Sequence, residues 1–152
     1  MVLSQHNGDL ELGGLTALSE KAAEALANHV ANRNRLILNG LTALSDKAAE
    51  SLSRNQSHLY LNGLIALSDK AAMALANHKD RCEDRRVFLG LNGLTGLSDI
   101  AAEALAQHYG DLDLNGLTKL SHTAAEAFSI HTGNLSLNGL ATVSYTHLTL
   151  PT

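Results

Sequence analysis

The sequence predicts an α/β solenoid in which short parallel strands alternate with short helices, stacked unit on unit. Three observations lead to this fold class. A Leu-x-Leu-Asn-Gly-Leu segment recurs along the chain, each copy leads into a Leu-Ser-x-x-Ala-Ala segment, and the copies keep a common spacing. The phase is marked by Gly14, Gly40, Gly63, Gly93, Gly116 and Gly139. Their successive spacings are 26, 23, 30, 23 and 23, so the unit has 23 residues, with insertions after the first and third copies.

Each unit begins with a pattern typical of a short strand. In the third copy Leu59 and Leu61 alternate with Tyr60 and Asn62, as in a strand with one buried face. Glycine is expected to end the strand because it adopts a positive φ freely. Asn-Gly also suggests a β-hairpin, but a helix pattern follows where a hairpin needs its second strand. We therefore predict one parallel sheet from six strands: Leu10–Leu12, Leu36–Leu38, Leu59–Leu61, Leu89–Leu91, Leu112–Leu114 and Leu135–Leu137.

The second half of each unit is typical of a short, capped helix. Ser68 is a favourable N-cap, and Asp69 suits the positive end of the helix dipole. Leu67 and Leu75 recur as apolar positions and are expected to be buried. Such a helix is too short to persist alone in water, so neighbouring units must cover both sides of each unit. Helices are expected to begin near Ser19, Ser45, Ser68, Ser98 and Ser121.

The units resemble leucine-rich repeats, in the variants that read L-x-L-x-x-(C/N)-x-x-I-T-D-x-x-L-x-x-L-A and form tandem bacterial-type arrays. Leu59 and Leu61 match the strand leucines, and the Leu67-Ser68-Asp69 segment matches I-T-D. Leu64, however, stands where the family has Asn or Cys. The resemblance covers nearly the whole chain. It implies a right-handed solenoid with strands on the concave face and helices on the convex face, and partner binding rather than catalysis.

The repeat pattern divides the chain into three parts. Residues 3–9 resemble residues 105–111, which begin inside the fourth helix pattern, so we expect residues 1–9 to be the end of a preceding repeat. Residues 10–144 hold five to six repeats, with units starting near 10, 36, 59, 89, 112 and 135. Residues 145–152 form a non-repeat tail, for which an origin outside the native protein is an open alternative. Neither end shows a polar capping repeat, which favours a fragment of a longer array that either self-associates end to end or frays at Met1–Asp9 and beyond Leu140.

Composition and charge narrow the classes of function. The net charge of −4 at pH 7 gives no reason to expect nucleic acid as a partner. No apolar run approaches the roughly 20 residues that a membrane span requires. The single cysteine, Cys82, excludes an internal disulfide framework and a Cys-based zinc site. No catalytic motif stands out, so we expect neither enzyme activity nor a cofactor, and the sequence indicates no compartment.

Candidate binding residues come from two columns on the predicted strand face. The exposed strand position changes from copy to copy, which suits specificity but is also what neutral drift on a solvated face produces. It holds Glu11, Ile37, Tyr60, Gly90, Asp113 and Ser136. The second column is Asn39, Asn62, Asn92, Asn115 and Asn138. It is expected chiefly to form a hydrogen-bonding ladder for the turns, with partner contact as the alternative.

Two further groups recur near the ends of the predicted helices. One is a histidine column that Asn55 interrupts: His6, His29, His78, His108 and His131. Stacked imidazoles could bind metal, but a helix C-terminus favours His through its dipole and last carbonyls, so we predict no metal site. The other is a set of loop cations, Arg33, Arg35, Arg54, Lys79, Arg81, Arg85 and Arg86, partly cancelled by Asp80, Glu83 and Asp84. This balance favours a solvated loop.

These patterns predict a non-catalytic repeat module that recognises a protein or peptide through its concave strand face. The alternative is a structural spacer array in a large surface or multidomain protein, with inert faces. The mixture of charged, aliphatic and aromatic residues at Glu11, Ile37, Tyr60 and Asp113 favours recognition.

Overall fold

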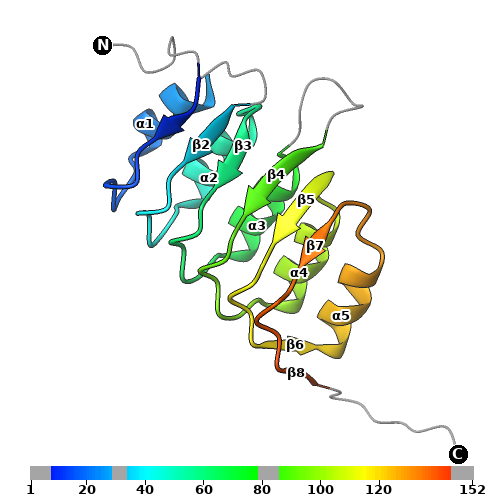
Figure 1. The fold of residues 1–152 in the computed structure, drawn as a ribbon. Helices are drawn as coiled ribbons and strands as arrows, with labels where there is room; N and C mark the ends of the chain where they lie inside the picture. The colour runs from blue at the N-terminus through cyan, green and yellow to red at the C-terminus, as the bar shows by residue number, and fades with distance from the viewer. Residues whose placement is uncertain (1–7, 29–33, 79–85, 145–152) are drawn as a thin grey trace, which may run out of the picture.

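The computed structural model describes residues 8–28, 34–78 and 86–144. Its strands are β1 Leu10–Glu11, β2 Arg35–Ile37, β3 His58–Tyr60, β4 Val87–Gly90, β5 Gly110–Asp113, β6 Lys119–Ser121, β7 Leu135–Ser136 and β8 Thr142–Ser144. Six of them form one parallel sheet in the order β1-β2-β3-β4-β5-β7 (Figure 1). The predicted alternation of strands and helices around one six-stranded parallel sheet is confirmed. A small parallel pair, β6-β8, was not predicted.

The leucines that open the repeats lie opposite one another in the sheet. Leu36 pairs with Leu10 on one side and with Leu59 on the other, and this register continues through Leu89, Leu112 and Leu135. β2, β3, β4 and β5 begin one or two residues before the predicted positions, because residues ahead of the first leucine already pair with a neighbouring strand. No antiparallel hairpin forms at the Asn-Gly pairs in the described chain.

In the described ranges, five helices lie side by side along one face of the sheet (Figure 1). They are α1 Glu20–Ala27, α2 Asp46–Ser53, α3 Asp69–Ala76, α4 Asp99–Ala106 and α5 His122–Ser129. Each predicted serine is the N-cap, and its hydroxyl accepts a hydrogen bond from the backbone N–H three residues on. The Ser68 hydroxyl also donates to Asp46 of the preceding helix, 2.5 Å away. None of the described helices is long and apolar enough to cross a membrane.

The core lies between the sheet and the helices. In the third unit Leu59, Leu61, Leu64 and Leu75 are fully buried. Leu67 is partly buried and packs against this core, so the expected burial is confirmed in full for Leu75 and in part for Leu67. The buried alanines of each helix are small, which lets the helix lie close to the sheet.

The repeated glycine has a different physical reason from the one predicted. Only Gly8 and Gly110 have a positive φ among the described glycines. At Gly63, a Cβ atom would lie 2.1 Å from the Asn39 carbonyl oxygen and 2.6 Å from that of Leu41. The same conflict recurs at Gly40, Gly93, Gly116 and Gly139. Glycine is needed because the backbone of the preceding unit passes too close for any side chain.

Candidate functional site

We call the face of the sheet that points away from the helices the strand face. It carries two columns of side chains. Its second column is the exposed strand position predicted from the sequence, and it is distinct from the asparagine column. The structure brings the residues of this column together in register: Glu11, Ile37, Tyr60, Gly90, Asp113 and Ser136. The first column was missed: Asp9, Arg35, His58, Phe88, Asp111 and Asn134. Its signal was present in the sequence, because the two-residue alternation extends one step before each first leucine.

An ion pair closes the β1–β2 end of the strand face. The Arg35 guanidinium donates to Asp9 Oδ2 through Nε at 3.0 Å and Nη2 at 2.8 Å, and the Arg35 backbone N–H donates to Asp9 Oδ1 at 2.8 Å. The backbone and side-chain hydrogen bonds from Arg35 lower the pKa of Asp9, and the bond to Asp9 raises the pKa of Arg35. Both side chains are solvent-exposed. The pair therefore holds the Asp9 and Arg35 side chains in place and neutralises their charges at the β1–β2 end of the sheet.

Two further side chains of the first column accept hydrogen bonds from the next strand. His58 Nδ1 accepts from the Phe88 backbone N–H at 2.9 Å. Because Nδ1 accepts, the proton of the neutral His58 ring lies on Nε2. Asp111 Oδ1 accepts from the Asn134 backbone N–H at 3.0 Å. These contacts hold the side chains at fixed places on the sheet.

An aromatic pair forms the apolar centre of the strand face. The ring centroids of Tyr60 and Phe88 lie 4.7 Å apart, with their planes tilted by 34°. Gly90 makes this packing possible, because a Cβ atom there would lie 2.9 Å from Cε1 of Phe88. Ile37 lies beside Tyr60 in register and extends the apolar surface. All three apolar side chains are partly exposed.

The β5 side of the strand face is acidic. Partial burial raises the pKa of Asp113, and repulsion from Asp111 acts in the same direction, while a hydrogen bond with Asn92 opposes both. Within the described ranges neither Asp111 nor Asp113 forms an ion pair. The two carboxylates therefore present negative charge that no ion pair within the described residues neutralises.

The predicted asparagine column forms a continuous ladder at the ends of the strands. In each step Oδ1 of one asparagine accepts from the backbone N–H of the next, over 2.8 to 3.0 Å: Asn39 to Asn62, Asn62 to Asn92, Asn92 to Asn115 and Asn115 to Asn138. The ladder satisfies turn amides and locks neighbouring units together. Partner contact through these asparagines stays a prediction.

The histidine column departs from expectation at His78 and His108, which lie inside the molecule. His78 and His108 are 0% and 1% exposed, and their nearly parallel rings stack with centroids 5.8 Å apart. Burial lowers the pKa of His78 to about 3 and that of His108 to about 4. Both rings are neutral at pH 7, so the expected charge interaction with the helix dipole is wrong for these two residues.

Members of this column do bond backbone carbonyl groups of the preceding unit. His78 Nε2 lies 2.9 Å from the Ser57 oxygen, and His131 Nδ1 lies 3.0 Å from the Ala106 oxygen. Asn55 takes the same role and donates to the Leu26 oxygen at 2.6 Å. Lone pairs of imidazole nitrogens lie in the ring plane, so nearly parallel rings do not converge on one metal ion. Within the described ranges no group of three or more His, Cys, Asp or Glu could hold a metal.

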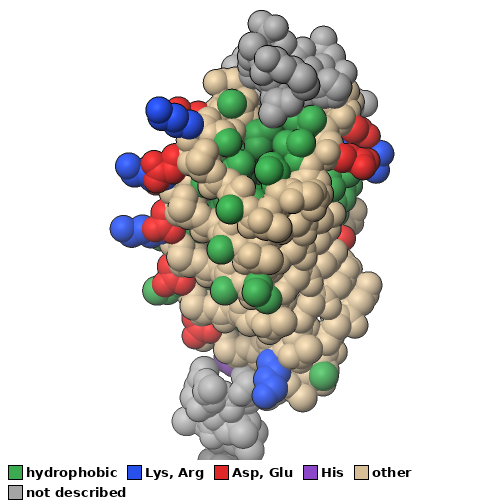
Figure 2. All heavy atoms as spheres, turned by 90° about the vertical axis from the view of Figure 1, so that its left-hand side faces the viewer, with side chains coloured by type: hydrophobic (Ala, Val, Ile, Leu, Met, Phe, Trp, Pro, Cys, Tyr) green, Lys and Arg blue, Asp and Glu red, His purple; other side chains and the backbone are tan. Residues whose placement is uncertain are grey.

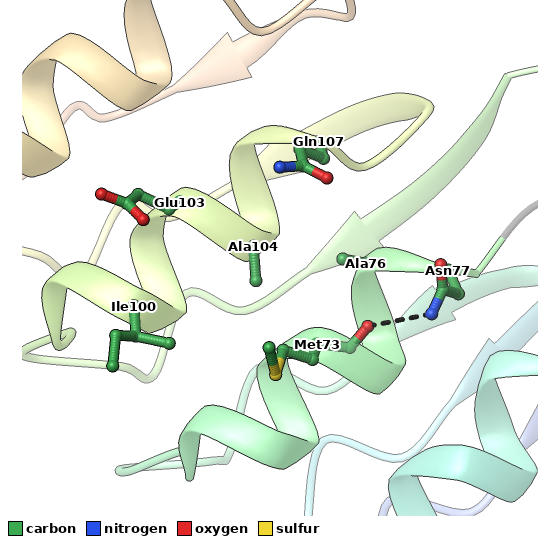
Figure 3. A pocket seen from close by; sticks show the side chains of 7 residues that line it. All are labelled: Met73, Ala76, Asn77, Ile100, Glu103, Ala104 and Gln107. Carbon is green, nitrogen blue, oxygen red and sulfur yellow. Dashed lines mark hydrogen bonds between the residues drawn. The ribbon is translucent and has the colours of Figure 1, made fainter.

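A second candidate surface lies on the helices, where a hollow of about 350 Å³ runs between α3 and α4 (Figure 3). Met73 of α3 and Ile100 of α4 line it, and each is 53% exposed. Ala104 points toward α3 between them, and Asn77 donates to the Met73 oxygen at 3.2 Å. A hollow of about 330 Å³ follows between α4 and α5. Most other copies hold charged residues at the Met73 and Ile100 positions, so these helices expose unusual apolar side chains.

Figure 2 shows a row of lysine and acidic side chains along one edge, and hydrophobic side chains that gather near the first unit. In that unit Leu15 is 36% exposed, whereas Leu41 and Leu64 at the same repeat position are fully buried. End-to-end association stays a prediction. Other predicted features lie outside the described residues: the segment 1–7, the tail 145–152, His6, His29, Arg33, Lys79, Asp80, Arg81, Cys82, Glu83, Asp84 and Arg85.

Comparisons of the chain with protein-family models, with curated proteins and with solved structures find no significant match. The surfaces of the chain itself therefore carry the functional inference.

Proposed function

We propose that this chain is a non-catalytic repeat module that binds a protein or peptide through the strand face. The observation that carries the proposal is the partly exposed Tyr60–Phe88 pair at the centre of a sheet face that none of the described helices covers. Aromatic side chains supply a large contact area with little loss of rotamer freedom, and they dominate the energetics of many interfaces. The asparagine ladder beside them makes the surface a rigid platform.

We also propose that the units are leucine-rich repeats, that the chain follows a right-handed course and that the strand face is concave. Support comes from the Leu-x-Leu strands and from helices gathered on the opposite face of the parallel sheet. A curved sheet of this kind suits an extended partner, because its side chains converge on the bound segment.

The alternative is a structural spacer array with inert faces. The strand face favours binding because Ile37, Tyr60 and Asp113 differ in kind while the buried leucine frame beneath them stays constant. The hollow between α3 and α4 is a competing surface for the same class of function, and Met73 and Ile100 are its apolar anchors.

Selection of a random peptide library against the wild-type chain tests the proposal. Enriched peptides should lose most of their affinity for the Tyr60→Ala, Phe88→Ala double variant. They should keep it for Met73→Ala, Ile100→Ala, a matched control that also removes two large exposed side chains. Circular dichroism of each variant checks that the fold is retained.

Two results would contradict the proposal. Peptides that depend on Met73 and Ile100 but not on Tyr60 and Phe88 would place binding on the helices. Failure of any peptide to enrich over repeated selections would favour the spacer.

A further inference from the structure

Three neighbouring strands place aromatic rings and carboxylates side by side on the strand face. Tyr60, Gly90 and Asp113 lie in register across β3, β4 and β5, and Phe88 lies opposite Asp111. Adjacent strands are roughly 4.8 Å apart. The two carboxylates therefore stand one to two strand spacings from the aromatic pair, within reach of a single bound segment.

Among the described residues, the strand face carries more acidic side chains than basic ones in its two columns, although Arg86 lies exposed just before β4. Its acidic residues are Asp9, Glu11, Asp111 and Asp113, and its arginine is Arg35. Arg35 is held by Asp9 at the far end of the sheet, so it does not reach the β5 carboxylates. Partial burial raises the pKa of Asp113 most, and repulsion from the neighbouring Asp111 carboxylate adds to the effect.

We propose that Tyr60, Phe88, Asp111 and Asp113 bind a basic segment of a partner protein in extended form. A lysine or arginine side chain places its charged group at the two carboxylates and its methylene stem against the rings, where cation–π attraction adds to the contact. An apolar side chain of the same segment packs on the Tyr60–Phe88 pair. This inference rests on the proposed function and specifies the chemistry of the partner.

The spacing of the sheet fixes the pattern of the segment. In an extended peptide, alternate side chains point to the same side about 7 Å apart. That distance falls between the one and two strand spacings, roughly 5 and 10 Å, that separate the carboxylates from the rings. The segment should therefore carry a basic residue and an apolar residue, such as phenylalanine, two positions apart.

The test uses fluorescein-labelled peptides of repeating Ser-Lys-Ser-Phe, measured by fluorescence anisotropy against the whole chain. Peptides with Glu or with Ser in place of Lys are the comparisons. We expect the lysine peptide to bind most tightly and to weaken as salt rises. The Asp111→Asn, Asp113→Asn variant should lower its affinity about tenfold. Asn at 111 keeps an oxygen that can accept from the Asn134 N–H, so the sheet contact is preserved.

A matched control removes two other charges, with Glu24→Gln and Glu50→Gln on the exposed side of α1 and α2. This control should leave affinity unchanged. The inference is overturned if the glutamate peptide binds as tightly as the lysine peptide, or if both charge variants weaken binding equally.

The outcome also separates this inference from the proposed function. Loss of binding in Tyr60→Ala, Phe88→Ala without any effect of Asp111→Asn, Asp113→Asn would leave the strand face as a binding surface and refute its preference for a basic partner. If the lysine peptide bound with unchanged affinity to the aromatic variant and to the aspartate variant, the proposed function and this inference would both be refuted.

Discussion

Lowering the pH from about 7 to about 5 is expected to destabilise the protein through two buried histidines. In the unfolded chain a histidine takes up a proton near the ordinary pKa of 6.5, whereas burial lowers the pKa of His78 to about 3 and that of His108 to about 4. Their contribution to stability is therefore complete above pH 6.5 and is lost as the pH falls toward the folded pKa values. The other titratable groups whose charges act on these two histidines are His58, His131 and Asp111.

The magnitude follows from the difference between the folded and unfolded pKa values. Each unit of pH below the unfolded pKa removes about 1.4 kcal/mol per histidine for as long as the folded form stays neutral. At about pH 5 the loss is therefore roughly 2 kcal/mol for each ring and roughly 4 kcal/mol for the pair. A domain of this size commonly has about 5–15 kcal/mol in total, so the effect is large.

Urea unfolding followed by circular dichroism at the two pH values measures this loss. The chain supplies its own control, because Asn55 occupies the same column and bonds a carbonyl without titrating. The double variant His78→Asn, His108→Asn should lose about 4 kcal/mol less than wild type over the same pH step. Equal losses in the two proteins would show that these histidines are not the source of acid sensitivity.

Three further predictions concern the frame that carries the strand face, each measured as the free energy of unfolding in urea. Gly63→Ala should lower this free energy by more than about 3 kcal/mol, because its Cβ meets the backbone of the preceding unit. Gly96→Ala, where the Cβ enters open space, should change it by no more than about 0.5 kcal/mol, and equal losses in the two variants would refute the close-approach explanation. Leu75→Ala should cost about 2–5 kcal/mol, and an unchanged midpoint would contradict its burial. Asn92→Ala should cost about 1–3 kcal/mol by leaving a turn amide unsatisfied, more than Asn138→Ala at the ladder's end, and the reverse order would refute the ladder.

Much of the frame could be predicted because each unit repeats the same local chemistry. The alternation around Leu59 gave the strand register, and the Ser68 type of residue gave every helix start. The strand face was predicted only in half. Its first column changes residue type between successive copies, from Arg35 to Phe88 to Asp111, so no repeated residue marks where strand pairing begins.

Other features depend on how units stack, which one copy of the repeat does not reveal. Gly63 reads as a turn residue, yet its constraint comes from the backbone of another unit. His78 reads as a polar helix end, yet the next unit covers it. The Tyr60–Phe88 contact joins positions from different columns and needs the missing side chain of Gly90, so spacing alone did not reveal it.

The most direct test of the binding proposal is to map where a selected peptide touches the protein. Amide chemical shifts of the isotope-labelled chain can be followed during titration with the tightest peptide from the library selection. The largest shifts are expected on β3, β4 and β5, at Tyr60, Phe88 and Asp113. Shifts centred on Met73 and Ile100, with the strand face unchanged, would contradict the claim that the open sheet face is the binding surface.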